Sequence, residues 1–386
     1  MKNPYSLDRT EQELISPVQN LCREELTKLC LEALKSKTAF PHGVLRSLAE
    51  LGLTGLSISE DFGGIKGGAR LQAAVYDLIS TQNLGPAIFI SVHGMVSGLI
   101  EKFGSPEQQQ AILPKLASGE WLGAFALSES DAGSDASNLS ATLTETPDGS
   151  AFILNGEKCW ITSAGAASLY LVFARLQGTH GKEGIAALLI QEDQQGLTIG
   201  SPEKKMGCEL SPIATLTFSE AVIPKEALLG KLGDGIKIAY GGLTGGRINI
   251  AACANGLSRS ALDKTVQYMK ERKAFGSRLS DFQGLQFKIA DMQTALDAAS
   301  LLVRDAATLQ ELSPADSETR LRAAEAKLFA TDTAMKITTE AVQLHGAMGY
   351  MKETGVEQLM RDAKMLQIVE GANEIQRGII ARGVLE

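Results

Sequence analysis

The sequence predicts an α+β protein in which a helical domain, a small β domain and a second helical domain follow one another along the chain. Apolar side chains recur at helical spacing over residues 1–120, short alternating runs fill residues 121–232, and a longer helical repeat occupies residues 233–386. The 386 residues exceed the ~250–300 at which a single hydrophobic core stops growing, so several domains are expected.

The N-terminal segment is predicted to be helical because its apolar residues recur near the helical repeat, at Leu14, Val18, Leu21, Leu26 and Leu29. In ELGLTGLSISEDFGG, residues 50–64, a helix end followed by a Gly-rich loop is expected. Ser105 and Pro106 predict another helix start, since serine caps a helix and proline fits its first turn.

The middle segment is predicted to form strands. Its runs are β-branched or aromatic and often alternate, as in AFILNGEKCWIT, LYLVFAR, IAALLI and ATLTFSEAVI. Pro-Asp-Gly at 147–149 and Asn155-Gly156 are turn signals.

The C-terminal segment is predicted to form long antiparallel helices in a bundle. Apolar residues follow alternating steps of four and three at Leu285, Ile289, Met292, Leu296, Ala299, Val303 and Ala306. A second run of this kind begins at Leu321, and Pro314 separates the two.

Charge and composition exclude several classes of protein. The net charge of -8 argues against nucleic-acid binding. Five cysteines without a C-x-x-C pair, and only four histidines, argue against a disulfide framework and a metal site. The acidic N-terminus has no signal-peptide h-region, and no stretch approaches the ~20 apolar residues of a membrane span, so we expect a cytoplasmic protein.

Two segments of the β domain contain groups suited to a flat, charged ligand. FALSESDAGSDASN, residues 125–138, offers small residues, hydroxyls and backbone N–H groups to a ring or a diphosphate. In NGEKCWITSAG, residues 155–165, Trp160 could stack on a ring and Thr162 could offer a hydroxyl to a ring nitrogen. A polar loop, a core tryptophan and a surface threonine would explain the same residues without a ligand.

Three further candidates lie in the C-terminal helices. Arg272 ends a long helix, where a guanidinium can grip a diphosphate or be merely solvated. His345, in AVQLHGAMGYMKE, is interpreted as structural. Glu370 lies between an apolar run and a glycine. Facing an apolar cavity, its carboxylate would have a raised pKa and act as a base, whereas in water it is an ordinary helix-end acid.

In their joint order these segments resemble the acyl-CoA dehydrogenase family over nearly the whole chain. The resemblance rests on EDFGG (60–64), ALSESDAGSD (126–135), KCWITS (158–163), GGRINIA (245–251), ERKAFG (271–276), QLHGAMGY (343–350) and RDAK…EGANEIQR (361–377). GGLTGGRINIAAC and AAEAKLFATD are most similar to the isobutyryl-CoA and short-branched-chain members. The resemblance implies an N-terminal helical domain, a middle β-barrel domain and a C-terminal four-helix bundle.

The resemblance also implies an FAD cofactor near the dimer interface of a homotetramer. Residues matching the flavin-contacting loop and the flavin ring's neighbours are Phe125, Leu127, Ser128, Ser134, Trp160 and Thr162. Those matching contacts from a neighbouring subunit are Arg272, Phe282, Gln283, Gln343 and Gly346, and Ala372 and Glu374 are further cofactor candidates. Substrate contacts are expected from Ser134, Thr244, Arg247 and Arg382.

The implied reaction is α,β-dehydrogenation of an acyl-CoA to a trans-2-enoyl-CoA. Glu370 matches the base that takes the α-proton, while the β-carbon gives hydride to flavin N5. By resemblance, the thioester oxygen is held by the FAD ribityl 2′-hydroxyl and the backbone N–H of Glu370. A family subset carries its base near Gly245 and Gly246, and glycine cannot supply one. Electrons would pass to an electron-transfer flavoprotein. An oxidase on the same fold and a non-catalytic flavin- or CoA-binding scaffold remain alternatives.

Several positions depart from the family pattern. Val369 stands where many members carry Tyr, Ala372 and Ala274 replace threonines, and Asn138 replaces a small residue. These changes remove hydroxyls near flavin or substrate but leave the base intact. They leave open the length and branching of the acyl group, although a short or short-branched chain is expected.

Overall fold

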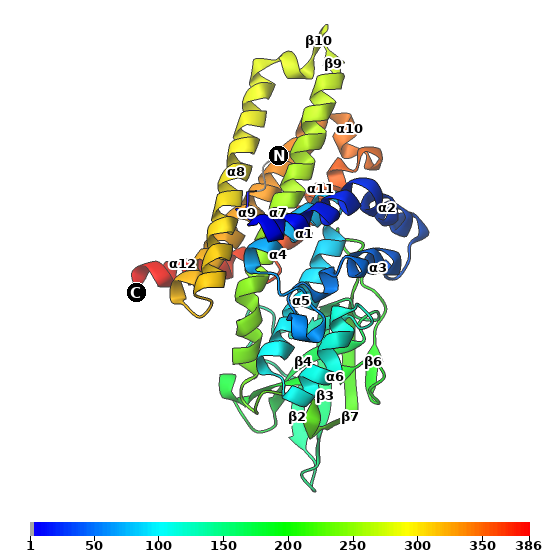
Figure 1. Cartoon of the computed structure of the whole chain (residues 1–386), viewed down its shortest axis with the longest axis vertical. Coiled ribbons are helices and arrows are strands. Elements are labelled where there is room, and N and C mark those ends of the chain that lie inside the picture. The colour runs from blue at the N-terminus through cyan, green and yellow to red at the C-terminus, as the bar shows by residue number, and fades with distance from the viewer. Residues whose placement is uncertain (1–3) are drawn as a thin grey trace.

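The computed structural model describes residues 4–386. Figure 1 shows the strands of the middle part gathered at one end of the long axis, while the long C-terminal helices, with a short hairpin between two of them, reach the other end. The N-terminal helices lie against both. The predicted arrangement of a helical domain, a β domain and a second helical domain is confirmed.

From residue 4 onward, the N-terminal part contains six α-helices. The helices are α1 (Arg9–Leu21), α2 (Thr27–Ser36), α3 (His42–Glu50), α4 (Ala69–Gln82), α5 (Leu84–Phe103) and α6 (Pro106–Ala117), with a π-helical turn at Cys22–Leu26 between α1 and α2. Ser105 caps α6 as predicted, because its hydroxyl accepts the backbone N–H of Gln108 while the Gln108 side chain accepts the N–H of Ser105.

Helix α5 corrects one expectation from the sequence. It is long and apolar enough to pass as a membrane span by length and composition, although 78% of its most apolar window is buried within the protein. It packs against α4, α6, α7 and β1. An apolar helix enclosed on all sides by other elements is typical of a protein core.

The middle part forms one eight-stranded sheet in the order β6-β7-β3-β2-β4-β5-β8, with β1 added to β4. The strands are β1 (Gly123–Ala126), β2 (Thr142–Glu145), β3 (Ala151–Thr162), β4 (Leu169–Leu176), β5 (Ile185–Gln191), β6 (Leu197–Ile199), β7 (Ile213–Pro224) and β8 (Leu228–Leu229). The expected turn at 147–149 joins β2 to β3, where the N–H of Gly149 donates to the carbonyl of Thr146.

The turn predicted at Asn155-Gly156 is wrong, because both residues lie inside β3. Gly156 has φ +135 at a break in the β3–β7 register, where a Cβ would lie 2.6 Å from Ala141 Cα. The Asn155 amide exchanges two hydrogen bonds with Glu220 of β7. Pairing with β7 and the close approach of Ala141 therefore override the local turn preference.

The C-terminal part is a bundle built on three long helices. Its elements are α7 (Gly235–Glu271), β9 (Lys273–Ala274), β10 (Ser277–Arg278), α8 (Gln283–Leu312), α9 (Ser317–His345), α10 (Ala347–Tyr350), α11 (Val356–Leu366) and α12 (Asn373–Leu385). Helix α7 packs against α8, α9 and α11 and also against α4 and α5 of the N-terminal part. It therefore connects all parts of the molecule.

Candidate active site

The Glu370 side chain projects from the turn between α11 and α12. Glu370 and Gly371 both have left-handed backbone conformations, with φ +56 and +88. A left-handed conformation is unfavourable for glutamate and is kept only where the surroundings enforce it. Here it directs the carboxylate onto α7, where a Cβ on Gly246 would lie 2.7 Å from Glu370 Oε2. The Glu370 carboxyl group therefore packs directly against the backbone of α7 at Gly246.

The environment of this carboxylate is suited to a base. Oε2 is buried and has no hydrogen-bond partner within residues 4–386. Burial raises the pKa of Glu370 to about 7, although the charges of Arg247 and Lys327 act to lower it. A buried carboxylate with a near-neutral pKa can accept a proton at physiological pH. The simpler interpretation, a solvated helix-end acid, does not fit this geometry.

The loop expected to contact the flavin is fastened to β3 by a buried ion pair. Lys158 Nζ lies 2.6 Å from Glu129 Oε1 and donates to the Leu127 carbonyl at 3.2 Å. Glu129 also accepts hydrogen bonds from Ser140 N, Ser140 Oγ and Ala141 N. Burial lowers the pKa of Lys158 to about 8, whereas the pKa of Glu129 falls because Lys158 and Ser140 outweigh its own burial. Both ends of the loop are thereby fixed.

Trp160 and Thr162 stand at the end of β3. Trp160 has φ +59 at a second break in the register with β7, and the residue is 54% exposed. No hydrogen bond within residues 4–386 engages the hydroxyls of Ser128, Ser134 or Thr162. An exposed indole and free hydroxyls near one loop offer a flat apolar surface and polar contacts to a ring system.

The second group of expected cofactor residues lies elsewhere. Arg272, Gln343 and Gly346 line an open pocket of about 380 Å³. Phe282 and Gln283 stand at the start of α8, whose residue Leu285 lines the same pocket. His345 also lines this pocket, where it stacks on Tyr268 with ring centroids 4.4 Å apart and its Nδ1 lies 2.7 Å from the Ala341 carbonyl, and it stays interpreted as structural.

The two groups of cofactor candidates lie in different parts of the fold, the first on the sheet and the second at the C-terminal end of α7. At its N-terminus Gly235 touches Ile185 of the sheet, and at its C-terminus Arg272 follows Glu271. With 37 residues at about 1.5 Å each, α7 is roughly 55 Å long. Figure 1 accordingly shows β9 and β10 at the opposite end from the sheet. The pocket of Arg272 therefore lies at the end of α7 that is remote from Ile185 of the sheet.

The substrate candidates are brought together only in part. Thr244 and Arg247 lie on α7 beside Gly246, and Arg247 Nε donates to the Glu370 carbonyl at 3.4 Å. Ser134 is exposed on the loop before β2. Arg382 is exposed in the last turn of α12, and no contact of its side chain with the Glu370 turn is present within residues 4–386. Ala372 and Glu374 flank the start of α12.

Family comparisons agree with this architecture. Residues 8–120, 124–221 and 233–385 match the models of the acyl-CoA dehydrogenase N-terminal, middle and C-terminal domains. The chain belongs to the acyl-CoA dehydrogenase family.

Individual relatives cover nearly the whole chain. The mitochondrial isobutyryl-CoA dehydrogenase of Dictyostelium discoideum is 39% identical over 360 residues, 93% of this chain and 85% of the relative. An acryloyl-CoA reductase (NADH) of Anaerotignum propionicum is 37% identical over 99% of this chain and 96% of its own.

Solved structures show the same fold. Butyryl-CoA dehydrogenase from Megasphaera elsdenii has a TM-score of 0.94 at 35% identity, covering 99% of this chain and 100% of that one. A chain solved in work on the electron transferring flavoprotein of Acidaminococcus fermentans has a TM-score of 0.94 at 36% identity, with 99% of both chains covered. A Bacillus anthracis acyl-CoA dehydrogenase complexed with FAD has a TM-score of 0.92 at 30% identity, over 99% of this chain and 69% of that one.

This acyl-CoA dehydrogenase family member is an FAD-dependent oxidoreductase. The residues present fit such a cofactor. An exposed Trp160 indole, held by strained backbone at the end of β3, gains a partner when a flat ring covers it. The ion pair of Glu129 and Lys158 fixes the adjacent loop, which would hold it in place for such a ring.

Sequence reasoning missed the residues that hold these loops. Glu129, Lys158 and Lys327 lie within quoted motifs, but no role was given to them. Lys327 could have been found from its position, because it is in phase with the apolar residues of α9 and yet charged. The contact between α11 and the loop before β7 was also missed, and there Asp362 Oδ1 accepts the backbone N–H of Cys208 at 2.6 Å.

Gly246→Ala is expected to displace the Glu370 carboxylate, the expected base, without unfolding the protein. The added methyl group would lie within 3.1 Å of three carboxyl atoms of Glu370, and only the end of that flexible side chain needs to move. Because a shift of ~1 Å can cost about 100-fold in rate, flavin reduction by acyl-CoA should slow by about 10- to 100-fold. Stopped-flow absorbance at the flavin band measures this rate.

Gly245→Ala is the matched control for this variant. A Cβ at Gly245 has no other atom within 4 Å, so the same helix gains the same methyl group without touching Glu370. Its reduction rate should equal that of the wild type. Equal rates in the two variants would show that the contact between Gly246 and Glu370 does not position the base.

Proposed function

We propose that this protein oxidises a short or short-branched acyl-CoA to the trans-2-enoyl-CoA, with Glu370 as the base. The observation that carries the proposal is the Glu370 carboxylate, whose Oε2 is buried without a hydrogen-bond partner within residues 4–386 and whose pKa of about 7 leaves it able to accept a proton near neutrality. The chain belongs to an FAD-dependent family, so an oxidant for the substrate is expected beside this carboxylate.

The turn that carries Glu370 can bind the thioester oxygen, in addition to supplying the carboxylate that removes the α-proton. The backbone N–H of Glu370 donates to no group within residues 4–386 and is free to donate to the thioester oxygen. A hydrogen bond there stabilises the negative charge that develops as the α-proton moves to the Glu370 carboxylate. Bound FAD supplies the oxidant that takes the β-hydride. Arg247, which donates to the Glu370 carbonyl, holds the turn toward α7.

Relatives support a short acyl group and electron transfer to a flavoprotein. Two of the similar proteins act, by name, on isobutyryl-CoA and butyryl-CoA, which both carry four acyl carbons. The side chains of Val369 and Ala372, on either side of Glu370 and Gly371, are small. The similar chain from work on an electron transferring flavoprotein supports such a protein as the electron acceptor.

Anaerobic bleaching of the flavin by a panel of acyl-CoAs tests the substrate class. Propionyl-, isobutyryl-, butyryl- and octanoyl-CoA should be compared, and we expect the four-carbon thioesters to reduce the flavin fastest. Fastest reduction by octanoyl-CoA would contradict the short-chain assignment, and no reduction by any thioester would favour the scaffold alternative. Rapid reoxidation of the product complex in air would favour the oxidase.

The separation of the two groups of cofactor candidates supports FAD binding between subunits. Because the pocket of Arg272 lies at the end of α7 that is remote from Ile185 of the sheet, we expect a neighbouring copy to bring its Arg272, Gln343 and Gly346 to the flavin of the first, as the family resemblance implies. The family resemblance extends this arrangement to a homotetramer of paired dimers. We further propose domain limits of 1–120, 121–232 and 233–386. A cytoplasmic location is also proposed, because the five buried free cysteines would persist there as thiols.

Arg272→Ala should weaken FAD retention by about 10- to 100-fold, because it removes hydrogen bonds from a charged donor to the diphosphate. Flavin content after gel filtration and fluorescence titration of the apoprotein measure the change. Lys270→Ala removes an exposed charge from the last turn of the same helix and should leave flavin affinity unaltered. An Arg272→Ala protein that binds FAD as tightly as the wild type would remove Arg272 from the cofactor site.

A further inference from the structure

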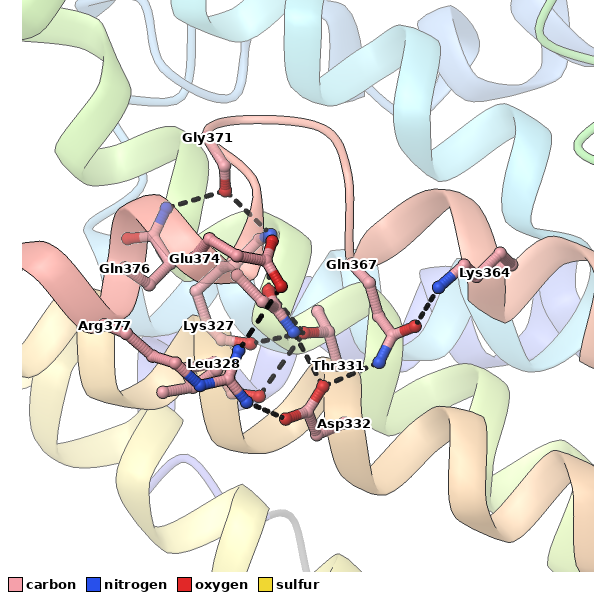
Figure 2. A network of polar contacts seen from close by, with 11 residues as sticks. Lys327, Leu328, Thr331, Asp332, Lys364, Gln367, Gly371, Glu374, Gln376 and Arg377 are labelled. Atoms are coloured by element: carbon pink, nitrogen blue, oxygen red, sulfur yellow. Dashed lines mark hydrogen bonds and ion pairs between the residues drawn. The ribbon is translucent and has the colours of Figure 1, made fainter. Parts of the chain in front are cut away.

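Lys327 lies buried beneath the turn that carries the base. It projects from α9, and its side chain is fully buried. Its Nζ donates to the Gly371 carbonyl at 3.0 Å and to Asn373 Oδ1 at 2.9 Å. Within residues 4–386 no carboxylate lies within ion-pair distance of Nζ. Figure 2 shows the side chain reaching from α9 toward the loop that includes Gly371.

Both ends of the same turn are fixed to α9 through Asp332. Gln367, which follows α11, donates to Asp332 Oδ1 at 2.6 Å, and Asn373, which begins α12, donates to it at 2.8 Å. Arg377 pairs with the other oxygen of Asp332 at 3.0 Å, as Figure 2 shows. Asp332 therefore holds the two ends of the turn, while Lys327 holds its middle.

A buried ammonium ion without a carboxylate contact costs stability, so a packing role alone would be better filled by an apolar residue. Burial lowers the pKa of Lys327 to about 8, and the charge of Glu370 is the largest influence opposing that shift. The other charged groups that face it are Arg247 from α7, Asp332 from α9 and Glu374 from α12.

We propose that Lys327 is a positioning residue for the base: its buried ammonium fixes the Glu370–Asn373 turn and places a positive charge beneath the Glu370 carboxylate. This inference rests on the proposed function of Glu370. The hydrogen bond to the Gly371 carbonyl orients the peptide groups next to the Glu370 N–H. The charge favours the ionised, proton-accepting form of the base.

Lys327→Met tests both parts of the role. Methionine keeps most of the volume but removes the charge and both hydrogen bonds. The holoenzyme should reduce its flavin about 10-fold more slowly at pH 7, because the base is misplaced and less ionised. The acid limb of the pH–rate profile should move up by roughly one unit, since a positive charge no longer favours the carboxylate. Single-turnover reduction per bound flavin, measured from pH 5.5 to 8, gives both values.

Lys336→Met is the control, because it removes an exposed lysine from the same helix. Its pH profile should overlay that of the wild type. A Lys327→Met profile that also overlays the wild type would overturn the proposal, as would a loss explained entirely by missing flavin. If Lys327→Met does not fold, Lys327→Gln keeps an amide donor without the charge. The upward shift of the acid limb is then expected alone, and its absence counts against the proposal.

A thermal double-mutant cycle separates this inference from the proposed function. Lys327→Met should lower the melting temperature at pH 7.5 more in the wild type than in a Glu370→Gln background, because the two charges interact only when both are present. Additive effects would overturn the proposed interaction between the charges of Lys327 and Glu370, even if no acyl-CoA reduces the flavin. If no thioester bleaches the wild type but the cycle is non-additive, the proposed function is contradicted, whereas the proposed interaction between the charges of Lys327 and Glu370 is supported.

Discussion

Glu370→Gln is expected to yield a holoenzyme that stays yellow and is no longer bleached by acyl-CoA. The glutamine amide is nearly isosteric and fits against Gly246, but it cannot accept the α-proton. Loss of a general base lowers rates by about 100- to 10,000-fold, which for this step leaves the flavin oxidised on the timescale of turnover. Anaerobic stopped-flow spectra measure the rate, and substrate affinity measured separately shows whether binding persists. Bleaching near the wild-type rate would remove Glu370 from the mechanism.

The same substitution should change the pH dependence of stability. The folded-state pKa of Glu370, about 7, exceeds the value of 4.5 expected in the unfolded chain. The stabilising contribution of the protonated group is complete below pH 4.5 and is lost as the pH rises through 7. Glu370→Gln, which stays neutral, should therefore be more stable than the wild type at pH 8, by up to about 3 kcal/mol, and equally stable at pH 4.5. Denaturant unfolding at both pH values measures this difference.

Lys158→Met is the second change with a large expected effect. It leaves Glu129 as an unpaired carboxylate in a site where the two side chains are 0% and 4% exposed. Breaking a buried pair from one side costs about 3–5 kcal/mol, so the melting temperature should fall and the loop at residues 125–138 should no longer retain FAD. Thermal unfolding and the flavin-to-protein absorbance ratio measure the two effects.

Two companion variants distinguish the ion pair from a general effect of losing lysine. Lys204→Met removes an exposed lysine close to the same sheet and should change neither stability nor flavin content. Adding Glu129→Gln to Lys158→Met should recover part of the lost stability, because no unpaired charge remains. If Lys158→Met melts with the wild type and keeps its flavin, the ion pair does not hold the flavin loop.

Local patterns were sufficient to predict the three-part fold. Helical repeats located α8, a serine and a proline located the start of α6, and the Pro-Asp-Gly turn located the β2–β3 hairpin. The failure at Asn155-Gly156 had a long-range cause, since the pairing of β3 with β7 and the approach of Ala141 decide the conformation there. Local preferences were overridden where distant segments meet.

The candidate site depended on such distant contacts, and spacing alone could not predict it. Nothing near Glu370 in the sequence indicates that its carboxylate rests on Gly246, or that Lys327 supports the turn from α9. The family resemblance supplied the role of Glu370, while the structure supplied a physical reason for it. Glu370 and Trp160 also share a left-handed backbone that neither residue type favours. Strained conformations of this kind are concentrated at functional sites.

The most direct test of the account is exchange of the α-hydrogen in D₂O. An acyl-CoA analogue with sulfur at the β-position can lose its α-proton but cannot give up a β-hydride. Mass spectrometry of the recovered analogue then reports proton removal separately from oxidation. We predict deuterium at the α-carbon after incubation with the wild-type holoenzyme and none above background with Glu370→Gln. Equal incorporation by the two proteins would contradict the assignment of Glu370 as the base.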